Sequence, residues 1–260
     1  MSPQETVRAQ ARDALKHNYA RALTALVTAL LPVVMIDAAS GAIINSLFAL
    51  GSASNTINVL NIVLIDPLIL IAGILLSPFL NGYIRVYYKN AFTGEMDLGD
   101  LFCYFEGGRY ANTLVLNLNL ILRLLLPAFF CYAPVILYIV ICSGMDNGFF
   151  GSVLYNDFYV ILWILSAVIL TLYSLRYFTV FTLYVENESL SVSDLFRTSK
   201  QIMRGQSGDA AKLIFSYTPW MLLCITVLPL LYVVPYMTQG LCIGAKWMTR
   251  AAFAAYEEKE

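Results

Sequence analysis

Long apolar stretches alternate with shorter polar segments along most of the chain. An α-helix needs about 20 residues to cross a bilayer, and each stretch has about this length or more. The six stretches lie approximately at residues 20–48, 64–89, 110–142, 157–185, 210–231 and 233–254. A very short turn near Pro229 and Pro235 is expected between the last two. The pattern therefore predicts an all-α fold, a polytopic membrane helix bundle with six transmembrane helices.

The composition also indicates a membrane protein. Of the 260 residues, 59% are hydrophobic and 13% are charged, and the mean hydropathy is +0.70. A soluble domain has about 25% charged residues. The formal net charge is −1, so no overall basic field favours nucleic acid. We expect the lipid bilayer to surround the protein and no nucleic acid to bind it.

Lysine and arginine are confined to alternate connections, with Arg123 as the one exception among 16 basic residues. The basic segments are 1–21, 85–109, 176–212 and the tail from residue 246. The connections without any basic residue are 49–63, 143–156 and 229–236. Because cytoplasmic loops carry the excess of basic residues, both termini are expected in the cytoplasm. The first stretch is then expected to be an uncleaved span.

The decapeptide TGEMDLGDLF at residues 93–102 recurs in similar form as NESLSVSDLF at residues 187–196. In each copy a residue suited to cap a helix, Asp97 or Ser191, stands three positions before an aspartate. The chain starts with a related pattern, SPQE, in which Ser2 is the cap. The three caps are separated by 95 and 94 residues.

Other short matches keep this spacing. Leu30-Leu31-Pro32 recurs as Leu125-Leu126-Pro127, and Tyr83 and Val86 recur as Tyr177 and Val180. We therefore predict one transmembrane domain, 1–260, built from three parallel hairpin repeats at approximately 2–96, 97–190 and 191–260. The alternative is that caps recur only because every span needs a way to enter the membrane.

Each cap is expected to begin a short cytoplasmic amphipathic helix with its apolar face toward lipid or the bundle. Apolar residues at helical spacing after the second and third caps form a candidate partner or interface surface: Leu98, Leu101, Phe102, Phe105, Val192, Leu195 and Phe196, with Ile202 and Met203 extending the last stripe. A weaker stripe follows Ser2: Val7, Ala11, Ala14 and Leu15.

Several short motifs resemble a bacterial six-span integral membrane family known only as a domain of unknown function. They are ARDALKHNY at 11–19, YSLRYF at 173–178, QIMRG at 201–205, FSYTPW at 215–220 and PYMT at 235–238. That family is distantly similar to the membrane part of some glycerophosphodiester phosphodiesterases. The resemblance implies a bacterial cytoplasmic membrane protein and supplies no catalytic residues. One departure is VLPLLYVVPY at 227–236, where a glycine-containing turn is expected.

Charged residues inside a membrane are costly and are therefore candidates for function. Arg123 lies well inside the third apolar stretch, one turn before Pro127, which leaves the Arg123 carbonyl without its usual helical partner. Residues expected at similar depth complete a candidate intramembrane polar site: Asn119, Ser77, Asn81, Tyr173, Ser174 and Tyr217. The alternative is a structural arginine that binds carbonyls and hydroxyls and fixes the packing.

Catalytic signatures are missing from the sequence, which has no HExxH, Walker A or GxSxG motif. Its five cysteines are scattered and His17 is the single histidine, so we expect no metal site, no cofactor and no enzyme activity.

The leading functional hypothesis is a non-enzymatic partner-binding or assembly module with a membrane or cytoplasmic protein partner. The alternative is a small transporter or channel with a polar path near Arg123. A membrane enzyme comes third, because it would need a catalytic pair that the sequence does not reveal.

Overall fold

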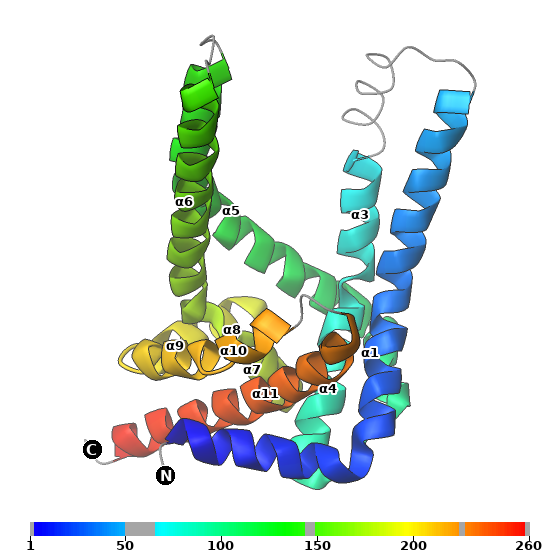
Figure 1. Ribbon diagram of the computed structural model, residues 1–260. Coiled ribbons are helices and arrows are strands. Elements are labelled where there is room, and N and C mark those ends of the chain that lie inside the picture. Colours follow the sequence, from blue (N-terminus) through cyan, green and yellow to red (C-terminus); the bar gives the residue numbers. More distant parts are fainter. Residues whose placement is uncertain (1–2, 50–65, 144–148, 224–226, 258–260) are drawn as a thin grey trace.

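The computed structural model describes residues 3–49, 66–143, 149–223 and 227–257, and within these ranges the regular structure is entirely helical (Figure 1). The longer helices are α1 (Pro3–Ala49), α4 (Pro78–Thr93), α5 (Arg109–Ser143), α6 (Phe149–Ser174) and α11 (Val227–Glu257). The shorter elements are α3 (Asp66–Leu76), η2 (Leu98–Leu101), η3 (Cys103–Phe105), η4 (Leu175–Tyr177), α7 (Val180–Glu186), α8 (Val192–Ile202), α9 (Ser207–Phe215) and α10 (Thr218–Leu223).

Four helical stretches are long and apolar enough to cross a membrane, as is typical of a membrane protein. They are Pro3–Ala42, Pro67–Thr93, Arg109–Tyr138 and Asp157–Glu186. These stretches coincide with the first four apolar stretches of the sequence. In Figure 1 they form two arms, α1 with α3 and α5 with α6, that separate as they rise from a base made of α11 and shorter helices.

The last two predicted spans differ from the structure. Residues 210–231 do not form one helix, because α9 ends at Phe215 and α10 begins at Thr218. The predicted turn near Pro229 and Pro235 is wrong, because α11 runs without a break from Val227 to Glu257. Pro235 removes one backbone hydrogen bond, which a helix tolerates when its packing holds it. The count of six spans and the hairpin layout are therefore not confirmed.

Apolar residues of α11 pack closely against another segment of the chain. A Cβ atom at Gly240 would lie 1.8 Å from the Oη atom of Tyr217, and one at Gly244 would lie 2.3 Å from a methyl carbon of Leu213. The glycines thus let the segment 207–217 press against α11 in the base, where Figure 1 shows α11 lying crosswise beside the first part of α1. This apolar run packs against protein rather than forming a hairpin of two spans.

A bend at Asn18 divides α1 into a lower segment and a rising segment. Asn18 has non-helical backbone angles, φ −118° and ψ 16°. Its side-chain amide donates to the Asn90 side-chain oxygen at 2.8 Å and to the Gly94 carbonyl at 3.1 Å. Asn90 in turn donates to the side-chain oxygen of Gln239 at 3.0 Å, and both of these side chains are buried. This polar network joins α1, α4 and α11 at the bend.

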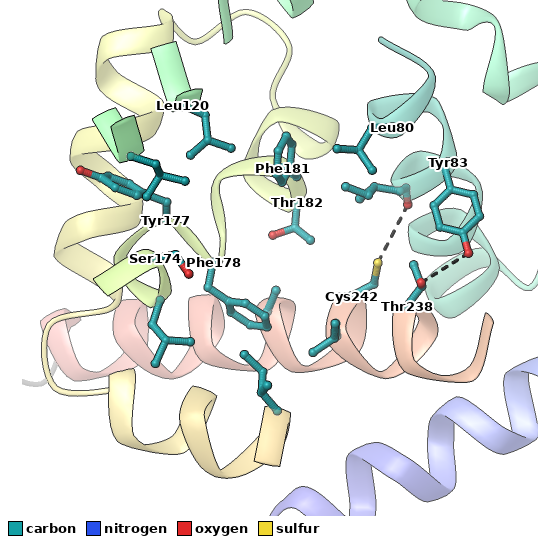
Figure 2. A pocket seen from close by; sticks show the side chains of 16 residues that line it. Leu80, Tyr83, Leu120, Ser174, Tyr177, Phe178, Phe181, Thr182, Thr238 and Cys242 are labelled. Atoms are coloured by element: carbon teal, nitrogen blue, oxygen red, sulfur yellow. Dashed lines mark hydrogen bonds between the residues drawn. The ribbon is translucent and has the colours of Figure 1, made fainter. Parts of the chain in front are cut away.

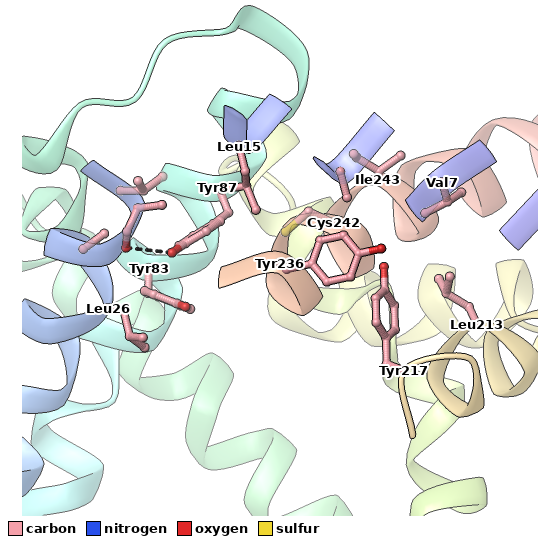
Figure 3. Close-up of a cluster of buried hydrophobic side chains, with 14 of the residues drawn as sticks. Val7, Leu15, Leu26, Tyr83, Tyr87, Leu213, Tyr217, Tyr236, Cys242 and Ile243 are labelled. Atoms are coloured by element: carbon pink, nitrogen blue, oxygen red, sulfur yellow. Dashed lines mark hydrogen bonds between the residues drawn. The ribbon is translucent and has the colours of Figure 1, made fainter. Parts of the chain in front are cut away.

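The lower segment of α1 buries the weak apolar stripe that its sequence predicts. Val7, Ala11 and Leu15 are buried, whereas Ala14 is half-buried. Figure 3 shows Val7 and Leu15 in one cluster with Tyr87, Tyr217 and Ile243. The stripe therefore faces the protein base.

The caps predicted in the two decapeptides are confirmed. The Asp97 carboxylate accepts from the Gly99 amide at 2.9 Å, and the Ser191 hydroxyl accepts from the Asp194 amide at 3.2 Å. The elements that follow differ, because the first copy continues into the two short 3₁₀ turns η2 and η3 instead of an α-helix. Ser2 lies outside the described residues, and the threefold repeat stays a prediction.

Candidate functional site

The seven residues of the candidate polar site do not come together. Arg123 is exposed, and its Cζ atom lies 4.4 Å from the centre of the Phe196 ring of α8. In Figure 1, α5 rises obliquely from the base before it lies beside α6. The Arg123 guanidinium therefore packs on a helix of the base.

Neighbours that were expected to share this site make local contacts instead. The Asn119 amide donates to the Val115 carbonyl of its own helix at 2.9 Å. The Ser174 hydroxyl likewise donates to the Thr171 carbonyl at 2.8 Å. The Tyr173 ring contacts a different cation, because the Cζ atom of Arg176 lies 4.7 Å from the centre of this ring. None of these contacts forms a polar centre with Arg123.

Ser77 and Asn81 belong to another place, at the start of α4. The Asn117 amide donates to the Ser77 hydroxyl at 3.0 Å, which links α4 to α5. Asn81 is 1% exposed, and within the described part of the chain its amide has no hydrogen-bond partner. Buried amides are nearly always paired, so an ordered water is the expected partner.

Tyr217 occupies a third place, in the base. Its side chain is fully buried against Gly240, and its ring lies 5.4 Å from the Tyr236 ring in an edge-to-face arrangement. Among the described residues its hydroxyl has no hydrogen-bond partner. Burial raises the pKa of the Tyr217 phenol above its ordinary value, so this group stays protonated.

Most of the candidate partner surface is buried inside the chain. Leu101, Leu195 and Phe196 are buried, and Leu98, Phe105 and Val192 are half-buried. Phe102 is the exception, because 46% of it is exposed. The apolar stripes were predicted to face lipid, the bundle or a partner, and the structure shows that they mainly build the chain's own cores.

Phe102 is held in a defined position despite its exposure. Its ring lies 5.3 Å from the Phe79 ring in an edge-to-face arrangement, and Phe79 also lies 4.7 Å from Phe105. A Cβ atom at Gly82 would come within 2.3 Å of the Leu101 carbonyl oxygen, so η2 sits directly against the backbone of α4. The aromatic ring is thus presented from a tightly packed support.

An ionic network joins the two decapeptides. The Asp100 carboxylate binds Arg85 at 3.0 Å and Lys89 at 2.8 Å. Arg85 also pairs with Glu188 of the second copy, and Arg109 binds the same carboxylate at 3.2 Å. Sequence reasoning missed this network, because Arg85 and Glu188 are 103 residues apart and no local pattern connects them.

A cavity of about 440 Å³ lies between α4, α5, the segment 174–182, α9 and α11 (Figure 2). Most of its wall is apolar, with Leu80, Leu120 and Phe181 among the lining residues. Its size falls in the range of about 300–1,000 Å³ that is typical of ligand pockets. The wall therefore favours an apolar ligand or an apolar part of one.

Most of the few polar groups of this wall bond within the protein. The Thr238 hydroxyl donates to the Val234 carbonyl at 2.9 Å and lies 3.4 Å from the Tyr83 hydroxyl. Burial raises the pKa of the Cys242 thiol to about 12, which keeps it protonated at neutral pH. Among the described lining residues there is no carboxylate and no imidazole, so the wall offers little acid–base chemistry.

The sequence contained one signal for the part of this site that α11 contributes. Gly240 and Gly244 are spaced four apart in an apolar run, a pattern typical of close helix packing in membranes. It predicts that a neighbouring segment approaches α11, although it does not say which one.

Comparison with known proteins gives a family and no function. Neither the curated proteins nor the solved structures contain a match, and the similarity to glycerophosphodiester phosphodiesterases stays a prediction. Residues 1–243 match the family described as protein of unknown function (DUF975). This match spans both arms and most of the base, so the chain belongs to the DUF975 family.

Proposed function

We propose that this protein is a non-enzymatic partner-binding or assembly module of a bacterial cytoplasmic membrane. The observation that carries the proposal is the contrast between Phe102 and its counterpart Phe196, which are 46% and 1% exposed. Both residues close the same decapeptide, yet only the first presents its ring to the surroundings. Exposed aromatic rings on a rigid support are the side chains that most often dominate protein interfaces.

The setting of Phe102 supports this role. Phe79, which also packs against Phe105, fixes the ring from one side, and the pairs of Asp100 with Arg85 and Lys89 hold the turn next to it. A pre-organised contact loses little conformational entropy when a partner binds. The expected partner is therefore a protein that buries the Phe102 ring in an apolar pocket of its own.

The orientation of the protein follows from the same arrangement. Figure 1 shows the start of α1 and the end of α11 close together beside the base, which also contains α8 with its cap Ser191. All the basic segments of the sequence lead into this part of the molecule. By the positive-inside rule the base and both termini are cytoplasmic, so the partner approaches from the cytoplasm or along the inner leaflet.

The test is purification of a tagged protein from its own membrane in mild detergent, followed by quantitative mass spectrometry of the proteins that come with it. Phe102→Asp is expected to lower recovery of the partner roughly thirtyfold, because an aromatic hot spot contributes about 2 kcal/mol or more. The fold should survive, since this side chain is half exposed.

Phe92→Asp is the matched control. Phe92 is also exposed and lies on α4, 13 positions after Phe79, which corresponds to about 20 Å along the helix. This variant should retain the partner. Equal recovery with Phe102→Asp and the unchanged protein, or equal loss in both variants, would contradict the proposed contact.

A small transporter or channel near Arg123 is the alternative function, and the cavity beside α5 is the observation that favours it. Reconstituted protein would then move a solute across vesicles, and Arg123→Ala would abolish the flux while the protein stays folded. The assembly proposal expects no flux that depends on Arg123.

A further inference from the structure

The 440 Å³ cavity is placed where a lipid chain can reach it. Two of its walls come from α4 and α5, which belong to stretches long and apolar enough to cross the membrane. The opposite wall comes from α11 in the base. The cavity is open rather than enclosed. The Thr238 and Ser174 hydroxyls of the wall donate to carbonyls of the protein, so these two groups keep their hydrogen bonds when an apolar chain enters the cavity.

A free positive charge lies next to this cavity. Leu120 and Leu124 of α5 line the wall, and Arg123 lies between them on the same turn, toward the neighbouring face. The Arg123 guanidinium lies on the Phe196 ring, and that ring is 5.4 Å from Tyr177, another lining residue. One aromatic layer therefore separates the charge from the apolar wall.

Among the described residues no carboxylate neutralises this charge. Elsewhere in the base Arg85, Lys89 and Arg109 pair with carboxylates, whereas within the described ranges Arg123 makes no ion pair. The helix beside it adds two exposed bases, Arg197 and Lys200. Basic residues beside a pocket between membrane helices, on the cytoplasmic side, are the chemistry that holds anionic headgroups.

We propose that the cavity binds one acyl chain of an anionic phospholipid and that Arg123 binds its phosphate. The apolar wall selects the chain, and the unpaired guanidinium offers the fork of donors that fits phosphate oxygens. This site is separate from the Phe102 contact and does not depend on a protein partner.

The test uses native mass spectrometry of the full chain in an uncharged detergent. Phosphatidylglycerol and phosphatidylcholine with identical acyl chains are titrated, and the ratio of their dissociation constants at the first bound lipid is measured. Arg123→Ala should reduce the preference for phosphatidylglycerol about fivefold, the effect of one base at a membrane surface. Arg123→Lys should keep most of it, because the charge remains.

Two further variants separate this site from general lipid attraction. Ser174→Phe places a ring in the cavity and should weaken the first binding of both lipids about tenfold, because the chain loses buried methylene groups. Arg250→Ala removes an equal charge from an exposed position of α11 and should change nothing. Thermal unfolding of each variant shows whether it is folded.

Several outcomes would overturn the proposal. An unchanged lipid preference in Arg123→Ala, or an equal loss in Arg250→Ala, would assign the binding to overall charge. Undiminished lipid binding by Ser174→Phe would show that the acyl chain does not bind in the cavity. Displacement of the lipid by glycerol phosphate, which has no acyl chain, would assign the site to a free phosphate compound.

Discussion

The two copies of the decapeptide show how one local pattern ends in two different environments. In both copies the cap forms as predicted, and the leucine that follows it, Leu101 or Leu195, is buried. The next residue differs, because Phe102 is half exposed and Phe196 lies beneath Arg123 and against Tyr177. Capping is decided by a few neighbouring atoms, whereas exposure is decided by which distant segment packs on top.

Glycine explains part of this difference. The first copy has Gly99 inside its turn, where the second has Ser193, and it is followed by Gly107 and Gly108 with positive φ angles. Glycine disfavours an α-helix by about 1 kcal/mol per residue relative to alanine. The first copy therefore stops at two short turns, whereas the second continues as α8 over 11 residues. The longer helix brings Phe196 under α5.

Truncating the two phenylalanines should give the largest contrast. Phe196→Ala is expected to cost about 3–5 kcal/mol, as deletion of a buried aromatic ring does, and it also removes the ring on which Arg123 lies. Phe102→Ala should cost about 1 kcal/mol or less, because half of the ring is already exposed. Unfolding by denaturing detergent in mixed micelles measures both. Equal losses of stability would mean that Phe102 is covered in the folded protein.

A smaller effect is expected where η2 touches α4. Gly82→Ala places a methyl group 2.3 Å from the Leu101 carbonyl oxygen, a backbone atom that cannot easily move, and should cost about 1–3 kcal/mol. Gly73→Ala in α3 is the control, because nothing lies within 4 Å of the new atom. The same unfolding assay compares the two variants. A neutral Gly82→Ala would show that the turn does not press against α4.

The smallest effect should be the same in both copies. Asp97→Ala and Ser191→Ala each remove one side-chain acceptor at a cap and should cost about 1 kcal/mol. Amide hydrogen exchange should accelerate at Gly99 in the first variant and at Asp194 in the second. A clear difference between the two would mean that the caps are not equivalent and would weaken the predicted repeat.

The local features of this protein follow from the sequence by itself. The first four apolar stretches, the caps at Asp97 and Ser191 and the buried stripe of Val7, Ala11 and Leu15 are each found in the structure. Each depends on residues that are close in sequence, through helical periodicity or a side chain bonding an amide two or three positions later. Such interactions need no knowledge of the rest of the fold.

Only the tertiary structure decided where the remaining apolar and charged residues lie. Hydropathy reports that a segment leaves water, but it does not distinguish a lipid neighbour from a protein neighbour. For this reason the hydropathy pattern predicts parts of two spans where the structure has the single helix α11, whose Gly240 and Gly244 pack against Tyr217 and Leu213.

The charged groups have the same limitation. The place of Arg123 against Phe196 depends on how α5 packs on α8, and the network around Arg85 joins residues up to 103 positions apart. The free energy of an ion pair depends on the distance between the two charges in space. That distance cannot be derived from the number of residues between them.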